Sequence, residues 1–431
     1  MKGYSKYRET GLPWLPHIPA HWAWRMLSQT GKEQQIRNLN DHDYPVLSLS
    51  YGNIIRKKNI ELGLVPSNYD NYQIVHAGNI ILRLTDLQND HKSLRTGLVQ
   101  EDGIITSAYT CIKSTENPAF IHYVLHVYDM KKIFYGMGGG VRQSIAYKDI
   151  RNMMLPVPPR EEQDQIVCYL DWQTSRIDKI ISAKKKQIAL LEEQKRAAVN
   201  EAVTHGLNAN VPMKNSGVEW LGEIPAHWDV VKLRQILRPV SVKNHPNLPL
   251  LSVVREKGVI LRDLEDKESN HNFVPDDLSN YKVVRKKQFV MNKMKAWQGS
   301  YGISPYDGIV SPAYYVFDVD FKNLEYFHYA IRSKVYVNFF AQASDGIRVG
   351  QWDLSMAKLK EIPFIVPPDE EQREIVAQIP ELLKEYDALI KKLNDYIDRL
   401  NEYKSKLISD VVTGQIDVRG LLTQNDEEPD G

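Results

Sequence analysis

The chain has 431 residues, of which 42% are hydrophobic and 25% charged, and a formal net charge of +1. This length predicts two domains that each have a core of their own, and the near-neutral charge argues against a long, indiscriminate basic groove for nucleic acid. Two cysteines without CxxC spacing predict neither a disulfide framework nor a zinc site. Residues 1–10 are polar and no apolar run is long enough to span a bilayer, so we expect a cytoplasmic protein without a membrane partner.

The chain contains an internal repeat at an interval of about 206 to 209 residues. The matched segments are residues 10–22 with 216–228, which share Ile-Pro-Ala-His-Trp, then 71–75 with 280–284, 102–109 with 307–314, and 155–163 with 364–372. Each copy is typical of short strands and turns followed by one long helix. The copies differ most in their middles, which predicts two similar domains with different ligand specificities.

The second long helix is predicted to open after Pro367-Pro368, with Asp369 and Gln372 forming a capping box, and to end at Gly414. Pro380 is predicted to kink or restart it. Its apolar residues alternate at the 4-3 spacing of a coiled-coil seam, which we place at Ile375, Ile379, Leu382, Tyr386, Leu389, Leu393, Tyr396, Leu400, Tyr403 and Leu407.

The first long helix carries a weaker seam, because Lys184 and Lys195 interrupt it. Its apolar members are Leu170, Ile177, Ile181, Ile188, Leu191, Ala198 and Ala202. We expect the two helices to pair with each other in antiparallel fashion within one molecule, and pairing between two copies of the chain stays open.

The sequence contains only weak matches to motifs of catalytic proteins. The run Asn117-Pro118-Ala119-Phe120 resembles the loop of adenine-N6 methyltransferases, but the second copy keeps only Asn323 and Tyr326, which favours a helix cap. The glycines at 136–140 lack the strand-to-helix context of a dinucleotide loop. With no metal-ligand spacing, phosphate loop or nucleophile elbow, we predict a non-catalytic chain without catalytic residues, cofactor or metal.

Basic, amide and aromatic residues in turns are the remaining candidates. Arginine and glutamine suit guanine and adenine edges through paired hydrogen bonds. The arginines at 142 and 348 each follow glycines just before a long helix, and other members lie where the copies diverge. The predicted DNA-binding set is Arg83, Arg142, Gln143, Lys293, Lys295, Trp297, Arg348 and Gln351.

Residues 297–317 (WQGSYGISPYDGIVSPAYYVF), the doubled Pro-Pro-x-Glu-Glu-Gln helix openings and the doubled Ile-Pro-Ala-His-Trp segments resemble the specificity subunit of type I restriction-modification systems, over about residues 10–415. The resemblance implies an α+β fold of two tandemly repeated mixed α/β target recognition domains, separated by two long antiparallel coiled-coil helices. The domains would be residues 1–158 and 207–367, the spacer helices 159–206 and 368–415, and an acidic flexible tail 416–431.

The resemblance also implies a function. Each domain would read half of a bipartite, asymmetric target in double-stranded DNA, and the helices would set the gap. Two methyltransferase (modification) subunits, which bind S-adenosylmethionine, and a restriction/translocase subunit would be the partners. The first copy lacks the tryptophan and Gln-Gly-Ser of the second, so its base-reading residues are less defined. The alternatives are a stand-alone DNA adenine methyltransferase and a coiled-coil scaffold that reads no DNA.

Overall fold

The computed structural model describes residues 2–39, 44–57, 69–85, 87, 94–137, 145–219, 221–255, 257–263, 274–348 and 351–421. It divides into two compact units, unit 1 with Met1–Ala183 and Asp395–Gly431, and unit 2 with Lys184–Asn394. The boundary falls inside both long helices, α4 (Arg160–His205) and α9 (Asp369–Val412). Each unit therefore holds part of both helices, and the domain boundaries given above stay a prediction.

Unit 1 is built from short antiparallel strands. Its main sheet has the order β10 (Thr96–Leu98), β9 (Asn79–Leu82), β12 (Thr110–Ser114), β4 (Gly31–Glu33), beside a sheet of β11 (Gly103–Thr106), β8 (Tyr72–Val75) and β5 (Ile36–Arg37). The paired strands are β1 (Tyr7–Leu12) with β2 (Leu15–Pro19), β3 (Ala23–Met26) with β13 (Met154–Val157), and β6 (Leu47–Ser50) with β7 (Asn53–Arg56). The short helices are α1 (Leu27–Thr30), α2 (Pro118–Met130), η1 (Ile133–Gly136) and α3 (Tyr147–Ile150).

Unit 2 repeats this plan. Its main sheet has the order β17 (Leu237–Val240), β24 (Tyr314–Val319), β21 (Phe289–Asn292), β22 (Tyr301–Ile303). The paired strands are β20 (Lys282–Val284) with β23 (Gly308–Val310), β18 (Leu251–Val254) with β19 (Gly258–Leu261), β14 (Met213–Asn215) with β15 (Glu223–Pro225), β16 (Asp229–Lys232) with β27 (Pro363–Val366), and β25 (Ser344–Arg348) with β26 (Gln351–Leu354). The short helices are α5 (Leu233–Ile236), η2 (Ala296–Gln298), α6 (Leu324–Ile331), α7 (Lys334–Gln342) and α8 (Met356–Glu361). The sequence repeat is thus a structural repeat.

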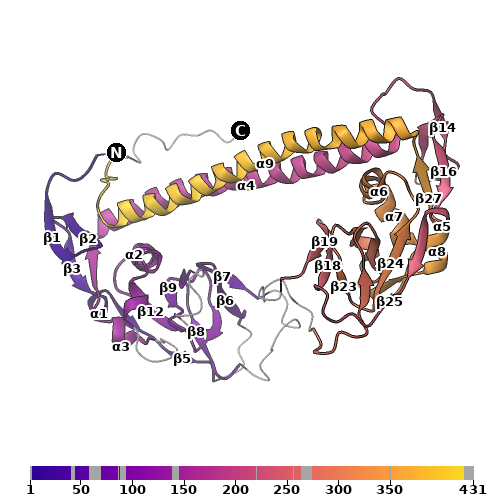
Figure 1. Cartoon of the computed structure of the whole chain (residues 1–431). Coiled ribbons are helices and arrows are strands. Elements are labelled where there is room, and N and C mark those ends of the chain that lie inside the picture. Colours follow the sequence, from indigo (N-terminus) through magenta and orange to yellow (C-terminus); the bar gives the residue numbers. More distant parts are fainter. Residues whose placement is uncertain are drawn as a thin grey trace. The chain divides into compact units, whose positions relative to one another are not determined.

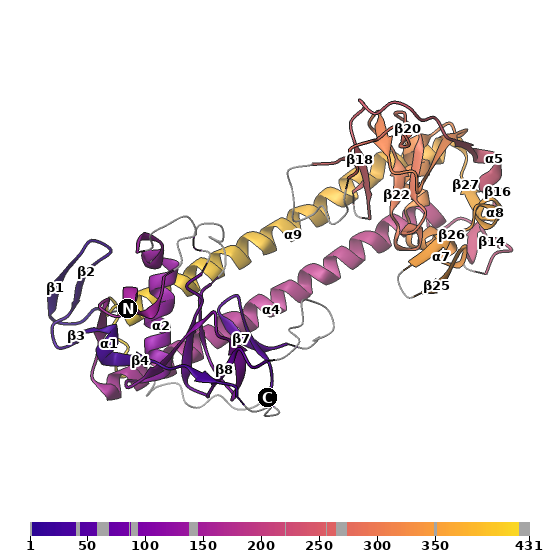
Figure 2. The same ribbon diagram turned by 90° about the horizontal axis from the view of Figure 1, so that it is seen from below.

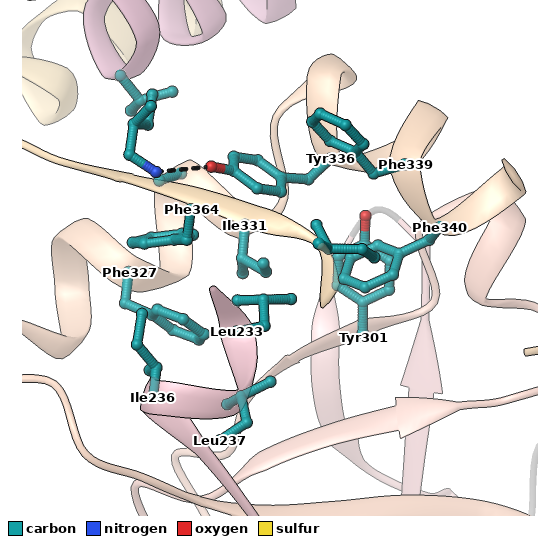
Figure 3. Close-up of a cluster of buried hydrophobic side chains, with 14 of the residues drawn as sticks. Leu233, Ile236, Leu237, Tyr301, Phe327, Ile331, Tyr336, Phe339, Phe340 and Phe364 are labelled. Atoms are coloured by element: carbon teal, nitrogen blue, oxygen red, sulfur yellow. Dashed lines mark hydrogen bonds between the residues drawn. The ribbon is translucent and has the colours of Figure 1, made fainter. Parts of the chain in front are cut away.

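The core of unit 2 is rich in aromatic side chains. Phe327 from α6, Tyr336 from α7 and Phe364 from β27 are fully buried against one another (Figure 3). The polar end of Tyr336 is satisfied, since Ile365 N donates to its hydroxyl at 3.1 Å. Aromatic rings bury large areas for few rotatable bonds, so these contacts fix α6 and α7 on the strand that leads into α9.

Within each unit the two long helices pack side by side in opposite directions (Figures 1 and 2). Asp178 of α4 pairs with Lys404 of α9 in unit 1, and Lys195 of α4 pairs with Asp387 of α9 in unit 2. Because the later residue of α4 meets the earlier residue of α9, the coiled coil is antiparallel. The predicted α+β fold with two long antiparallel coiled-coil helices is confirmed.

The predicted seam of α9 is wrong in its middle. Ile390 and Ile397 are buried, whereas the predicted seam residues Leu389, Tyr396 and Tyr403 are 48%, 45% and 46% exposed. Apolar residues occupy both alternatives, so the period alone does not select the phase. In the structure the residue that faces α4 at this point is Lys404. The prediction chose its neighbour Tyr403 because the search considered apolar residues only.

The helix openings also differ from prediction. Gln372 Nε2 donates to Pro367 O at 2.8 Å, and Gln163 Nε2 donates to Pro158 O at 2.9 Å in the other copy. The residue before Asp369 is a proline without an N–H, so no capping box forms and α9 begins at Asp369 itself. α9 also continues through Pro380 without a restart. The predicted end is correct, since Gly414 follows the helix with φ +72°.

The first turn of each long helix contains a glutamate that forms hydrogen bonds with the adjacent histidine and tryptophan of the repeated segment in the same unit. Glu162 accepts hydrogen bonds from Trp22 Nε1 at 3.0 Å and from the Tyr4 hydroxyl at 2.6 Å, and His21 Nε2 lies 2.8 Å from its second oxygen. The counterpart Glu371 accepts from Trp228 Nε1 at 2.7 Å and bonds to His227 Nε2. These bonds attach the repeated segments to the helices.

Candidate nucleic-acid interface

Three strand ends of unit 2 meet at one place. β20 begins at Lys282, β21 ends at Asn292, and β24 begins at Tyr314, which lies opposite Asn292 in the antiparallel ladder. Lys282 Nζ donates to Tyr314 O at 2.6 Å and lies 5.9 Å from the centre of the Tyr315 ring. The sheet thus positions a partly buried ammonium group beside two tyrosines.

Two further lysines lie near this ammonium group. Val283 N donates to Val242 O at 2.8 Å, which brings Lys243 near Lys282. Burial lowers the pKa of Lys282, and the positive charges of Lys243 and Lys293 lower it further. Like charges gather where an anion is to be bound, so we define Lys243, Lys282 and Lys293 as the lysine cluster.

The lysine cluster adjoins a pair of tryptophans. Lys293 Nζ forms a 2.8 Å ion pair with Asp353 on β26, and Leu354 N donates to Lys293 O at 3.1 Å. The neighbouring Trp352 is 36% exposed, and its ring centre lies 5.4 Å from that of Trp297 on η2, with 30° between the planes. Aromatic faces beside lysines are suited to stacking on nucleotide bases.

The predicted site residues of unit 2 are placed as follows. Lys293 and Trp297 belong to this surface, and Lys295 is exposed on the turn between them. Arg348 and Gln351 face each other in the ladder of the β25–β26 hairpin, and their side chains lie outside the described part of the structure. Of the five residues predicted in unit 2, the described contacts thus bring Lys293 and Trp297 to one surface, through their neighbours on β26.

Unit 1 has the same strand ends with other side chains. Gln73 Nε2 donates to Tyr109 O at 2.6 Å, as Lys282 does to Tyr314 O. Arg83 follows β9, and its N–H donates to Arg95 O at 2.8 Å, a bond that matches the one from Asn292 N to Ser300 O. Arg83 therefore corresponds to Asn292, and the predicted Arg142 and Gln143 lie outside the described residues.

The sequence interpretation missed Lys243, Lys282, Tyr315 and Trp352. The signal for Lys282 was present, because it stands against Gln73 in the matched segments 71–75 and 280–284. The agreement of the flanking residues hides this difference, because the sequence comparison looks for specificity only in the divergent middles of the copies. The structure shows that a strand can keep its pattern while its first residue, at the sheet end, changes from neutral to cationic.

The methyltransferase-like run forms a helix cap, as the repeat predicts. Asn117 Oδ1 accepts from Ala119 N at 2.9 Å and Phe120 N at 3.1 Å, and its Nδ2 donates to Asp164 at 2.6 Å. Among the described residues, no group of three or more His, Cys, Asp or Glu side chains is arranged to hold a metal ion. No described helix is both long and apolar enough to cross a membrane.

Comparisons with known proteins agree with this geometry. A family model described as "Type I restriction modification DNA specificity domain" matches residues 227–399. The "Putative type I restriction enzyme MjaX specificity subunit" of Methanocaldococcus jannaschii is 26% identical over 320 residues, which cover 71% of this chain and 70% of the relative. Residues 227–399 thus match the DNA specificity domain of type I restriction-modification systems, and the chain is similar to specificity subunits of these systems.

Two further similarities agree with this one. The "Type I restriction enzyme MjaVIII specificity subunit" of the same archaeon is 28% identical over 170 residues, which cover 39% of this chain and 37% of that subunit. A chain from a solved structure, described as "Structural basis underlying complex assembly and conformational transition of the type I R-M system", aligns with a TM-score of 0.60. It covers 93% of this chain and 99% of its own length at 14% identity, and so shows a shared fold.

Proposed function

We propose that this specificity subunit reads a bipartite, asymmetric target in double-stranded DNA and directs adenine methylation or restriction by partner subunits. The observation that carries the proposal is the repeated sheet end, which keeps its backbone but differs in its side chains. Gln73 and Arg83 in unit 1 stand where unit 2 has Lys282 and Asn292. Two copies of one scaffold with different exposed chemistry are what two different half-sites require.

The base-reading residues remain a proposal for Arg83, Lys293, Lys295 and Trp297, and for the predicted residues whose side chains are not described. Arginine and lysine can bind the O6 and N7 acceptors of guanine, and each well-formed contact discriminates by about 1–3 kcal/mol. The formal net charge of +1 limits how much phosphate binding this chain supplies alone. Partner subunits would supply the rest.

We propose that α4 and α9 act as the spacer that sets the gap between the half-sites. Each helix is unbroken across the boundary between the units, and 46 residues of α4 correspond to about 69 Å at 1.5 Å per residue. Half-sites on one face of DNA are separated by whole turns of about 34 Å. A coiled coil of this length is stiff enough to hold such a separation.

The proposed partners are two methyltransferase subunits and a restriction/translocase subunit. Methyl transfer from S-adenosylmethionine would take place in the methyltransferase subunits, with no catalytic residue in this chain. Tyr396 and Tyr403 support a docking role for α9, because they are seven residues apart on one helix face and nearly half exposed. Exposed aromatic stripes are typical of interfaces between proteins.

The test is a map of methylated adenines in genomic DNA from cells that carry the cognate methyltransferase subunits, with and without this chain. We expect a split motif that appears only when the chain is present. If the same motif persists without it, the chain does not read the target. Sequence-selective footprinting then separates a reader from a scaffold that binds no specific DNA.

The stand-alone methyltransferase is the weaker alternative. In such an enzyme the amide at Asn117 would have to bind the target base, but both of its polar atoms are already committed to α2 and to Asp164. Methyl transfer by the purified chain alone, lost on Asn117→Ala, would revive this alternative.

A further inference from the structure

The sheet end of unit 2 brings two lysines close to each other. Lys243 lies three residues after β17, and the bond from Val283 N to Val242 O at 2.8 Å brings it near Lys282. Like charges that lie close together repel each other. The positive charges of Lys243 and Lys293 lower the pKa of Lys282 together with burial.

Unit 1 avoids this repulsion at the same position. There Arg37 lies opposite Gln73 in the ladder of β5 and β8, so one cation faces a neutral amide. Gln73 keeps the bond that Lys282 makes, because each donates to the backbone carbonyl of the tyrosine that follows the loop, Tyr109 or Tyr314, at 2.6 Å. The fold therefore does not need a lysine at this position, and the extra charge requires another explanation.

We propose that Lys282, assisted by Lys243, binds a backbone phosphate of the DNA half-site that unit 2 reads, and that unit 1 lacks this contact. The inference rests on the proposed function and assigns one residue to a role in it. A phosphate between the two ammonium groups would turn a repulsive pair of charges into an attractive set.

The chemistry of Lys282 favours a phosphate over a base edge. Its Nζ spends one of three N–H donors on Tyr314 O and keeps two. An ammonium group acts on phosphate as a compact point charge, whereas a base edge is read best by planar, paired donors. The contact would position the DNA beside Trp352 and Lys293 without specifying sequence.

The variant Lys282→Gln tests this assignment, because it installs the residue that unit 1 already uses and retains a donor for Tyr314 O. Binding of the full chain, in complex with its methyltransferase subunits, to a mixed-sequence DNA duplex is measured between about 50 and 200 mM salt. The slope of log K against log salt should become less negative by about 0.9, the value for one phosphate contact. The affinity should fall by the same factor for every sequence, and the methylated motif should not change.

Two variants control for charge and for fold. Lys360→Gln removes one exposed charge from α8 of the same unit and should leave the slope at its wild-type value. Lys282→Arg restores the charge and should restore the slope. Lys282→Gln should also unfold at or slightly above the wild-type temperature, since it keeps the hydrogen bond and removes the repulsion from Lys243.

The outcomes separate the two proposals. A wild-type slope in Lys282→Gln, while the wild-type complex binds DNA, overturns the phosphate contact and leaves the proposed function intact. A changed half-site in the methylation map also overturns it, because Lys282 would then read a base. If the wild-type complex shows no binding to DNA, the proposed function fails and this inference fails with it.

Discussion

Lys404 of α9 donates through Nζ to both carboxylate oxygens of Asp178 on α4, each at 2.7 Å. In unit 2 the lysine comes from α4 and the aspartate from α9, and Lys195 Nζ lies 2.5 Å from Asp387 Oδ1. The repeat relates the two pairs, because Asp178 corresponds to Asp387 and Lys195 to Lys404. The same Asp and Lys positions of the repeat thus define the antiparallel register twice, and a one-residue slip would break both pairs.

We predict a measurable coupling within this pair. Asp178→Asn and Lys404→Gln should each destabilise the chain, and the double-mutant cycle should give about 0.5 kcal/mol, because Lys404 is 27% and Asp178 58% exposed and solvent screens the pair. Chemical unfolding measures it. Asp178→Asn combined with Lys406→Gln, a lysine on an exposed position of α9, should be additive. If the effects of Asp178→Asn and Lys404→Gln on the unfolding free energy simply add, this ion pair does not help to fix the register of the two helices.

The two helix-opening glutamates should differ in their importance. Glu162 is 6% exposed and accepts from both Trp22 and Tyr4, whereas Glu371 is 34% exposed and accepts from Trp228. Removing a buried acceptor leaves its donors without partners. Glu162→Ala should therefore cost about 3 kcal/mol of unfolding free energy and Glu371→Ala about 1 kcal/mol. Thermal unfolding of the two variants checks the order, and equal losses would contradict it.

How far the sequence predicts the structure depends on the kind of residue. Repeats, helix openings and the two long helices follow from local pattern and were predicted. The phase of the α9 seam did not follow, because Leu389 and Ile390 are both apolar and only the partner helix selects between them. Trp352 was not predicted for a similar reason, since its neighbour Trp297 comes from η2, whereas the difference between Lys282 and Gln73 stands in the sequence itself. The pairing of strand ends is a tertiary fact that no single segment encodes.

Buried histidines should make the fold sensitive to acid. Burial, and then the charge of His126, lower the pKa of His122 on α2 to about 3, against 6.5 for a free histidine. Below pH 6.5 His122 is protonated in the unfolded chain but stays neutral in the folded chain. The folded state therefore keeps its full stability above pH 6.5 and loses stability as the pH falls toward 3. At pH 5 this one residue should cost about 2 kcal/mol.

The test compares unfolding free energies between pH 7 and pH 5. His122→Leu removes the titrating group, so its loss of stability over this range should be smaller than that of the wild type by about 2 kcal/mol, whatever its stability at pH 7. His245→Leu, at an exposed position, should keep the wild-type dependence. If His122→Leu loses as much stability between pH 7 and pH 5 as the wild type, His122 is not the group whose protonation destabilises the fold.

The partly exposed tyrosines of α9 should matter more for assembly than for folding. Tyr396→Ala with Tyr403→Ala removes two nearly half-exposed rings, so the unfolding temperature should fall by less than in a variant of a buried seam residue. Binding of the methyltransferase subunits, measured by calorimetry, should weaken at least tenfold, since interface tyrosines commonly contribute more than 1 kcal/mol each. Ile397→Ala is the matched contrast, because this buried seam residue should cost about 2–4 kcal/mol of stability. Unchanged binding in the tyrosine variant would place the methyltransferase elsewhere.

Inserting one heptad into both α4 and α9 should lengthen the gap in the recognised sequence. Seven residues add about 10.5 Å and return each side chain to nearly the same face, so the seam is kept. At about 3.4 Å per base pair, the methylation map should show a gap longer by about three base pairs. A heptad in α9 alone would shift Lys404 away from Asp178 and should weaken folding instead. An unchanged gap in a folded double insertion would show that the helices do not set the distance between half-sites.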